Sequence, residues 1–599
     1  MQKIESTPKN LKQLLQNAKY TIHYYQREYR WQEKHIEELI VDLTTEFLEN
    51  YRPEHKRSDV QNYGVYFMGS IIIAGRENAI IDGQQRFSSL TLLLMYLNNR
   101  LRKNGKNYDT INQMIFSETY GEKSFNINVA ERQICMETIF QDGTFNPESC
   151  GESVKNLWER YNDISEKFPE TITNDMLLHF CDWLIERVFF VEIVAKTDQD
   201  AQKIFVTMND RGLNLTPTEM LKGYLLSEIN NDETRKNFND SWKNKIATLK
   251  KDDDRGDEVF IKAWLRAQYT RNEEDYELIG GAFHKWVRDN HEALNLKTST
   301  DYEKFIKNFF HFIDIYSTIK NAERNFAEKT KYVYYNAQLN FTLQPQLLMA
   351  AVDLNDDENI VIEKINLTAR YIDLFINAKV TEYRSVARNI IERGISSMTR
   401  EIRSLPVNEL KFTLKKHYDN LNYSPIVLKE FVLNNFTKRY IKNILARITS
   451  FIEEKTGVKS NYTEYMKSQG KNPFEIEHII CNDFEKFRSV FSGKEEYTSY
   501  RNSIGALLLL RKSINASLSD AKYKIKRSKY GSTDGNIFAA SLVEDTYHNN
   551  PRFKKFMEEN NLSFEPYSKF GKAEIKKRIE LVIQLVNLIW NTKEFELYE

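Results

Sequence analysis

The sequence predicts a mainly helical α+β protein in three parts, and three observations lead to this fold class. The chain has 599 residues, which is too many for one hydrophobic core. Short β-rich runs occur in its first and last thirds, whereas the stretch between them shows helical spacing of apolar residues. We therefore expect an N-terminal part with a small sheet and helices over residues 1–230, a helical connecting region over 231–435 and a C-terminal α/β part over 436–599.

The composition excludes several classes of protein. The 85 basic and 85 acidic side chains cancel, so a globally basic surface is excluded and any nucleic-acid contact must use local basic patches. The four cysteines form no close pairs, which argues against a disulfide framework and against a cysteine zinc site. Because there is neither a signal-peptide core nor an apolar run of about 18 residues, we expect a cytoplasmic protein without a membrane partner.

The N-terminal part contains helix and strand patterns in a definite order. Residues 35–48 (HIEELIVDLTTEFL) have apolar side chains at helical spacing. The β-rich runs 65–73 and 79–82 form a predicted hairpin, which leads directly into a helix pattern over 87–97. Residues 187–194 (RVFFVEIV) are a third predicted strand.

Three further helices are predicted later in the chain. After residues 204–208 a turn is predicted, and a new helix starts with Thr216 as N-cap and Pro217 at its first position. In the C-terminal part, residues 438–457 and 573–590 have helical patterns that enclose the remaining strands.

The stretch AIIDGQQR, residues 79–86, has the pattern of a strand, a tight turn and a helix start. Glycine allows close approach of a ligand, a helix N-terminus offers free N–H groups, and arginine presents a planar charged fork to phosphate. We interpret this stretch as a phosphate or nucleotide cradle made of Asp82, Gly83, Gln84, Gln85 and Arg86. From the spacing alone, an ordinary turn in which Asp82 and Arg86 pair with each other is an equal alternative.

A second set of polar residues lies in the C-terminal part. Glu477 and His478 occur on a strand-like run, Asn502 precedes the apolar strand predicted over residues 504–510, and Asn515 follows that strand at the start of a basic helix pattern. Two strands followed by a helix, with these side chains in this order, are the layout of a ββα-metal nuclease site.

The chemistry of phosphodiester hydrolysis explains these residue types. His478 can act as the general base near neutral pH, and Asn502 can orient its imidazole. Glu477 and Asn515 supply oxygen ligands suited to Mg²⁺ or Mn²⁺. The alternative is that Glu477 and His478 are a structural pair with satisfied hydrogen bonds.

Basic residues gather just after this set. Such a local excess on a neutral protein suits a DNA backbone, although a solvated helix face has the same pattern. The predicted DNA-binding residues are Arg511, Lys512, Lys522, Lys524, Lys526, Arg527 and Lys529.

Both halves of the chain resemble one known arrangement, the GmrSD-type family of type IV, modification-dependent restriction endonucleases. The N-terminal half is similar to the family's DGQQR-motif domain in residues 25–31 (YQREYRW), 66–73 (YFMGSIII), 81–94 (IDGQQRFSSLTLLL) and 204–226. The C-terminal part is similar to its HNH-like nuclease domain in residues 477–479 (EHI), 502–510 (NSIGALLLL), 513–515 (SIN) and 579–590.

The resemblance implies an N-terminal domain related to ParB and sulfiredoxin folds that senses modified phage DNA. It implies that residues 82–86 bind or hydrolyse a nucleoside triphosphate, whether GTP, ATP or another, and that the C-terminal domain cuts double-stranded DNA with a metal ion. It also implies that further pocket residues are Tyr25, Gln26, Arg27, Asn209 and Arg211. For residues 209–212, a helix-to-helix turn is an equal alternative.

Two departures from the family pattern weaken the nuclease prediction. The usual Gly-Asn-Leu is Gly505-Ala506-Leu507, and Ile480-Cys481 stands where a proline is usual. We therefore expect an anti-phage, modification-dependent, nucleotide-regulated DNA endonuclease. A nucleotide-dependent DNA sensor with a degenerate nuclease domain is one alternative, and an interaction scaffold is another. The sequence leaves the oligomeric state open, a homo-oligomer included.

Overall fold

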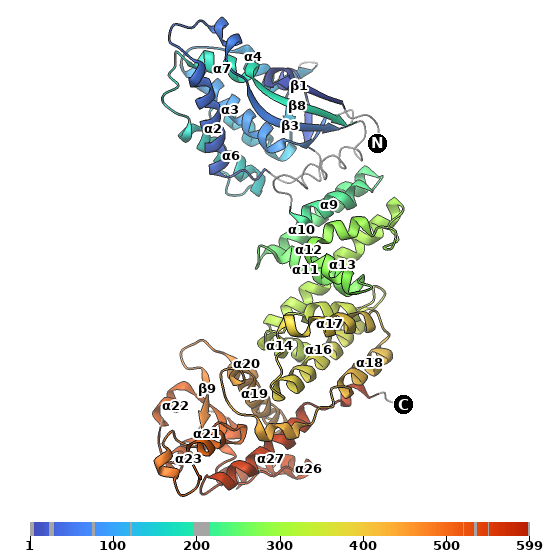
Figure 1. Ribbon diagram of the computed structural model, residues 1–599, viewed down its shortest axis with the longest axis vertical. Coiled ribbons are helices and arrows are strands. Elements are labelled where there is room, and N and C mark those ends of the chain that lie inside the picture. The colour runs from blue at the N-terminus through green and yellow to red at the C-terminus, as the bar shows by residue number, and fades with distance from the viewer. Residues whose placement is uncertain are drawn as a thin grey trace. The chain divides into compact units, whose positions relative to one another are not determined.

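The structure is a computed structural model, shown in Figure 1. By its contacts the chain divides into two compact units: unit 1 comprises Met1–Thr248 and Ala282–Lys307, and unit 2 comprises Leu249–Gly281 and Asn308–Glu599. The three-part division made from the sequence stays a prediction. The residues that the structure describes are 5–22, 29–74, 78–119, 122–195, 216–518, 520–531, 536–548 and 550–596.

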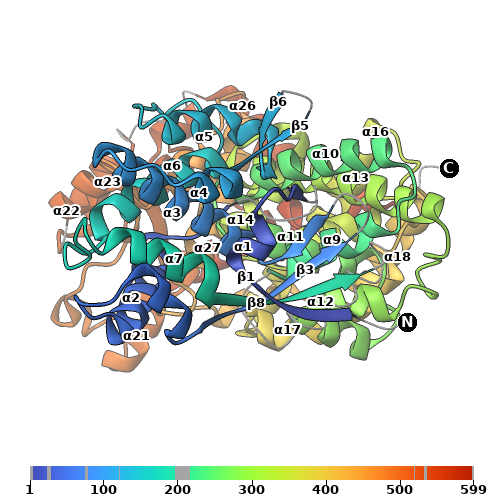
Figure 2. The ribbon, with the colours of Figure 1, turned by 90° about the horizontal axis from the view of Figure 1, so that it is seen from above.

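Unit 1 contains a mixed six-stranded sheet, in which β3 lies parallel to β8 and antiparallel to β4. Figure 2 shows β1, β8 and β3 side by side. The three predicted strands correspond to β3, β4 and β8, and the predicted β3–β4 hairpin is confirmed. In sheet order the strands are β1 (Glu5–Asn10), β8 (Val188–Ala195), β3 (Tyr66–Ala74), β4 (Ala79–Asp82), β2 (Tyr20–Ile22) and β7 (Ile127–Asn128).

Helix α3 (Gln84–Lys103) is largely buried. Two of its polar side chains are satisfied within the helix: Ser89 and Thr91 each donate to the carbonyl four residues earlier, at 2.9 Å. This back-bonding lets a helix with polar residues lie in a core. Unit 1 also contains a separate two-stranded antiparallel ribbon, β5 (Phe116–Thr119) with β6 (Glu122–Phe125).

Two other helices of unit 1 agree with the sequence predictions. Helix α2 (Glu33–Asn50) buries Ile36, Leu39 and Ile40, so its predicted apolar face is confirmed. At α9 (Pro217–Ser227), Thr216 accepts a hydrogen bond from the Glu219 N–H at 3.2 Å, which confirms the predicted cap. The remaining helices are α1 (Leu11–Leu15), α4 (Asp109–Ile115), α5 (Gln133–Phe140), α6 (Glu152–Lys167) and α7 (Leu177–Arg187).

Three helices run across the boundaries between the units: α10 (Asp232–Lys250), α12 (Glu273–Asp289) and α13 (Ser299–Arg324). Within residues 231–435, all of which are described, every regular element is a helix, and Val432 forms one isolated bridge. The predicted helical connecting region is therefore confirmed in its secondary structure. In unit 2 this stretch also supplies α11 (Gly256–Gln268), α14 (Lys331–Gln338), α15 (Gln344–Ala351), α16 (Glu358–Thr381), α17 (Arg388–Glu401) and α18 (Val407–Asp419).

A buried ionic network joins α16 to the last part of the chain. Asp373, which is 1% exposed, accepts hydrogen bonds from Arg447 at 2.9 and 3.2 Å and from the Trp590 indole at 3.1 Å. Arg370, one turn earlier on α16, donates to Asp373 at 3.1 Å and to the Ile589 carbonyl at 2.8 Å. Charges are buried at low cost only when they are paired in this way.

The C-terminal part of unit 2 holds a two-stranded antiparallel sheet, β9 (Phe474–His478) with β10 (Leu507–Arg511). The predicted strand over residues 504–510 starts later than expected, because residues 504–506 form a 3₁₀ turn. Gly505 packs against α27, where an added Cβ would lie 2.6 Å from the Ile575 carbonyl oxygen. The helices here are α19 (Lys438–Lys455), α20 (Tyr462–Met466), α21 (Lys494–Asn502), α22 (Lys512–Leu518), α23 (Tyr523–Tyr530), α24 (Ile537–Ala540), α25 (Asp545–His548), α26 (Pro551–Glu559) and α27 (Lys572–Ile589).

None of the helices in the described ranges has the length and apolar character needed to cross a membrane.

Candidate functional site

The β9–β10 hairpin and the helix after it bring the predicted nuclease residues into one region. In the antiparallel register His478 lies opposite Leu507, and Glu477 lies opposite Leu508. Helix α22 follows β10 at once and packs against both strands. Two strands and a helix thus occur in the predicted order. Successive side chains on a strand point to opposite faces, so His478 and Glu477 face different surroundings.

His478 is held by Asn502, the last residue of α21. The imidazole Nε2 lies 3.0 Å from the Asn502 Oδ1, as the sequence predicts for an orienting contact. With this carbonyl as acceptor, Nε2 carries the proton and Nδ1 is the basic nitrogen. Burial, aided by the charge of Arg501, lowers the pKa of His478 to about 4, against the opposing effect of Asn502. At neutral pH the ring is therefore uncharged, the state that a general base requires.

Arg501 is a functional candidate that the sequence analysis missed. It is half-buried beside His478, and its Nε has no hydrogen-bond partner among the described residues. Burial lowers the pKa of this guanidinium. A cation that is partly desolvated and lacks a carboxylate partner is suited to bind phosphate. Its position next to Asn502 was the available signal, but one arginine on a polar helix forms no pattern.

Glu477 and Lys526 form a buried ion pair with each other. The Glu477 Oε1 accepts from the Lys526 Nζ at 2.7 Å and from the Tyr530 hydroxyl at 3.2 Å. Lys526 is 1% exposed and also donates to the His478 backbone carbonyl at 2.7 Å. Burial raises the pKa of Glu477, while Lys526 lowers it. Glu477, the predicted metal ligand, thus binds Lys526, a predicted DNA contact, on the side of β9 away from the His478 ring.

The residues as placed do not fit a divalent cation. The carboxylate of Glu477 is neutralised by Lys526, and Asn515 on α22 offers only a neutral amide. Across the described ranges, no group of three or more His, Cys, Asp or Glu side chains could hold a metal ion. Hard divalent cations prefer charged oxygen ligands.

The remaining predicted DNA-binding residues differ in how far they are exposed. Arg511 lies over the Phe474 ring, with its guanidinium carbon 4.1 Å from the ring centroid, and donates to the Asn472 carbonyl at 3.1 Å. Arg527 is half-buried. The exposed members, which could contact a DNA backbone, are Lys512, Lys522, Lys524 and Lys529.

In unit 1, the AIIDGQQR stretch has the predicted strand, turn and helix geometry. Gly83 caps α3 with φ of +94°, a conformation that favours glycine, and an added Cβ would lie 3.3 Å from Ile71. Arg86 donates to the Asp82 carboxylate at 3.2 Å and to the Met68 carbonyl at 3.0 Å. The Asp82–Arg86 pair that the sequence left open as an alternative is thus present, and the Arg86 side chain is 24% exposed.

The two glutamines of this stretch are buried. The Gln85 Oε1 accepts hydrogen bonds from the backbone N–H groups of Arg30, at 2.9 Å, and Trp31, at 3.2 Å. Gln85 therefore holds the last two residues of the first family motif against the start of α3. The other predicted pocket residues lie outside the described residues: Tyr25, Gln26, Arg27, Asn209 and Arg211.

Comparison with protein families agrees with this arrangement. The family model for the GmrSD restriction endonuclease N-terminal domain matches residues 11–226. The model for the C-terminal domain of GmrSD restriction endonucleases matches residues 428–585 and thus includes β9, β10 and α22. No curated protein matches the chain. Restriction endonucleases are hydrolases that act on DNA, and this family is generally metal-dependent. With both domains matched in order over more than half of its length, the chain belongs to the type IV GmrSD family of restriction endonucleases.

Proposed function

We propose that this protein cleaves or nicks modified phage DNA at His478, under the control of a nucleotide bound by residues 82–86. The observation that carries the hydrolytic part is the neutral His478 imidazole, 3.0 Å from Asn502 and beside the half-buried Arg501. A base, a group that orients it and a cation for phosphate are the minimum that phosphodiester hydrolysis requires of side chains.

In the proposed step, His478 takes a proton from water, and the resulting hydroxide attacks phosphorus as the P–O bond to the leaving oxygen breaks. The leaving oxygen takes a proton from solvent, and His478 releases its own proton to solvent. Asn502 keeps the imidazole in one orientation, and Arg501 neutralises charge that develops on the phosphate oxygens. The exposed Lys512 and Lys524 contact the flanking backbone.

Dependence on Mg²⁺ or Mn²⁺ is part of the proposal through family membership, and the ligands are left unassigned because Glu477 is paired with Lys526.

The controlling nucleotide is a nucleoside triphosphate, whether GTP, ATP or another. We assign the main contact with its phosphates to Arg86. Its guanidinium is partly exposed at the N-terminus of a 20-residue helix, next to the Gly83 turn. A bound phosphate would compete with Asp82 for this side chain. In calorimetry, Arg86→Ala should abolish triphosphate binding, whereas Lys103→Ala, at an exposed position of the same helix, should not. Retained binding in the Arg86 variant would refute the assignment.

The test of cleavage is nicking of modified and unmodified phage DNA, with and without nucleotide, in Mg²⁺, Mn²⁺ or EDTA. His478→Ala should lose about 10²–10⁴-fold in rate, the usual contribution of general-base catalysis. Arg501→Ala should lose a comparable factor. The matched control is Arg488→Ala, whose side chain is 68% exposed. Equal nicking by the wild type and His478→Ala would overturn the proposed nuclease site.

A second candidate function, a nucleotide-dependent DNA sensor with a degenerate nuclease, is favoured by the Glu477–Lys526 pair and by Ala506. It predicts that the wild type retards modified DNA in a gel-shift assay but does not nick it in any metal. Nicking that depends on His478 would eliminate this candidate.

A further inference from the structure

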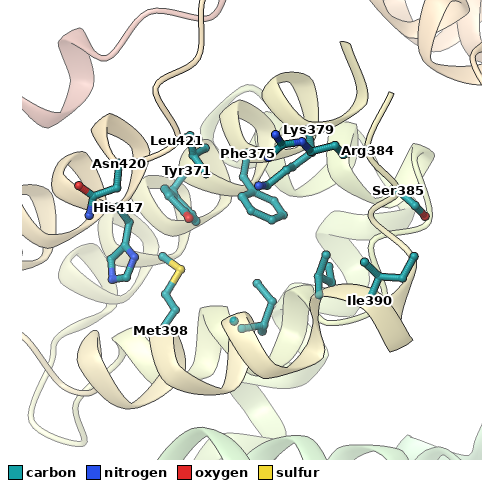
Figure 3. A pocket seen from close by; sticks show the side chains of 13 residues that line it. Tyr371, Phe375, Lys379, Arg384, Ser385, Ile390, Met398, His417, Asn420 and Leu421 are labelled. Carbon is teal, nitrogen blue, oxygen red and sulfur yellow. The ribbon is translucent and has the colours of Figure 1, made fainter. Parts of the chain in front are cut away.

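A cavity of about 600 Å³ lies in unit 2 between helices α16, α17 and α18 (Figure 3). Its lining residues fall within 371–421, between the two family matches, and the proposed cleavage chemistry uses none of them. The volume is in the range of small-molecule sites.

The long walls of the cavity are apolar and aromatic. On α16, Tyr371 and Phe375 lie with ring centroids 6.1 Å apart and planes inclined by 27°, and both are nearly buried. On α17, Met398 and Ile395 are buried as well. Figure 3 shows Met398 across the cavity from Tyr371 and Phe375. A slot between aromatic and thioether side chains accepts a flat ring.

The two ends of the cavity are polar in different ways. Lys379 and Arg384 lie at one end, and His417 and Asn420 at the other (Figure 3). Lys379 lies 5.7 Å from the Phe375 ring centroid and forms no ion pair with a described carboxylate. No Asp or Glu lines this cavity within the described part of the chain. Arg384 is paired with Glu382 at 3.4 Å, and the His417 Nε2 lies 3.0 Å from the Glu401 Oε2. Lys379 is therefore the cation that one end offers to an anion, and Asn420 offers hydrogen bonds at the other end.

We propose that this cavity binds a free 5′-mononucleotide. The phosphate would lie against Lys379 and Arg384, the base between α16 and α17, and the edge of the base toward His417 and Asn420. A fatty acid also carries an anion on an apolar body, but its chain end would meet the polar His417 and Asn420 without hydrogen bonds. This site is built from elements other than the residues 82–86 proposed for the triphosphate.

The test is calorimetric titration of the full-length protein with AMP and with adenosine, in EDTA. The wild type should bind AMP at least about tenfold more tightly than adenosine, because charge-assisted hydrogen bonds to the phosphate are lost in the nucleoside. Lys379→Ala should remove most of this difference. Lys416→Ala, at an exposed position of α18 outside the cavity, should preserve it.

A blocking variant tests the location of the site. Gly394, on α17, lines the cavity, and a Cβ added there would meet no atom within 4 Å. Gly394→Leu should therefore weaken both ligands at least about tenfold without lowering the thermal midpoint, since leucine favours a helix over glycine. The proposal is overturned if the wild type does not bind AMP, if Gly394→Leu binds it normally, if Arg86→Ala abolishes AMP binding, or if decanoate binds more tightly than AMP.

Discussion

Replacing Lys526 with methionine would leave the Glu477 carboxylate buried without its cation. The two side chains are 1% and 5% exposed, and the ammonium donates to both Glu477 and the His478 carbonyl. Removing one partner of a buried ion pair costs about 3–5 kcal/mol, mainly because the other charge stays desolvated. In the double variant Glu477→Gln/Lys526→Met most of this loss should be recovered, because a neutral amide can still contact Tyr530.

The measurement is the thermal midpoint of the full-length protein by circular dichroism, with Lys524→Met as the matched control. Lys524 is exposed on the same helix, so its substitution should cost within about 0.5 kcal/mol. Lys526→Met should lower the midpoint by several degrees relative to that control. If the two variants melted alike, the ion pair would not hold Glu477, and its carboxylate would be available as the metal ligand that the sequence predicts.

Three further outcomes are expected. Because the pKa of His478 is lowered to about 4, the cleavage rate should stay constant from pH 7 to about 5 and fall only near pH 4. The stability of the fold should fall over a wider range, from about pH 6.5, where the unfolded imidazole takes up a proton, to about pH 4, where the folded one does. A fall of the cleavage rate centred near pH 6.5 would contradict this. Asp373→Asn should destabilise unit 2 by about 3–5 kcal/mol, because it leaves Arg447 buried without its carboxylate, and an unchanged thermal midpoint would contradict the network. Gln85→Ala should lower the free energy of unfolding by about 1–3 kcal/mol and speed hydrogen exchange at the Trp31 amide. Unchanged exchange would contradict the hydrogen bond from this amide to Gln85.

Local periodicity was enough to predict the elements whose side chains face the core. The apolar runs that became β3, β4 and β8, and the face of α2, follow from spacing alone. Strand β1 could not be predicted in this way. Its sequence, ESTPKN, is polar and contains Pro8, and it is a strand because it pairs with the edge of β8 more than 170 residues later. An edge strand tolerates proline, and its pairing partner is a long-range property.

Among the predicted nuclease residues, too, local contacts could be predicted from the sequence and long-range contacts could not. The His478–Asn502 contact follows from the ordered motif and was predicted. The pairing of Glu477 required knowing which face of β9 meets α23, although Lys526 and Tyr530 stand four residues apart and so share a helix face. The role assigned to Arg501 depends on burial without a partner, which only the packed structure reveals.

The Asp373 network determines where the C-terminal family domain can be cut from the rest of the chain and still fold. The C-terminal family match begins at residue 428, yet the counter-ion of Arg447 inside it comes from α16. Arg370, on the same helix, caps the carbonyl that ends α27. A fragment cut at the start of the match would expose two broken contacts in its own core. We expect the smallest autonomously folding C-terminal fragment to begin at or before Glu358, so that part of the predicted connecting region belongs structurally to the C-terminal family domain.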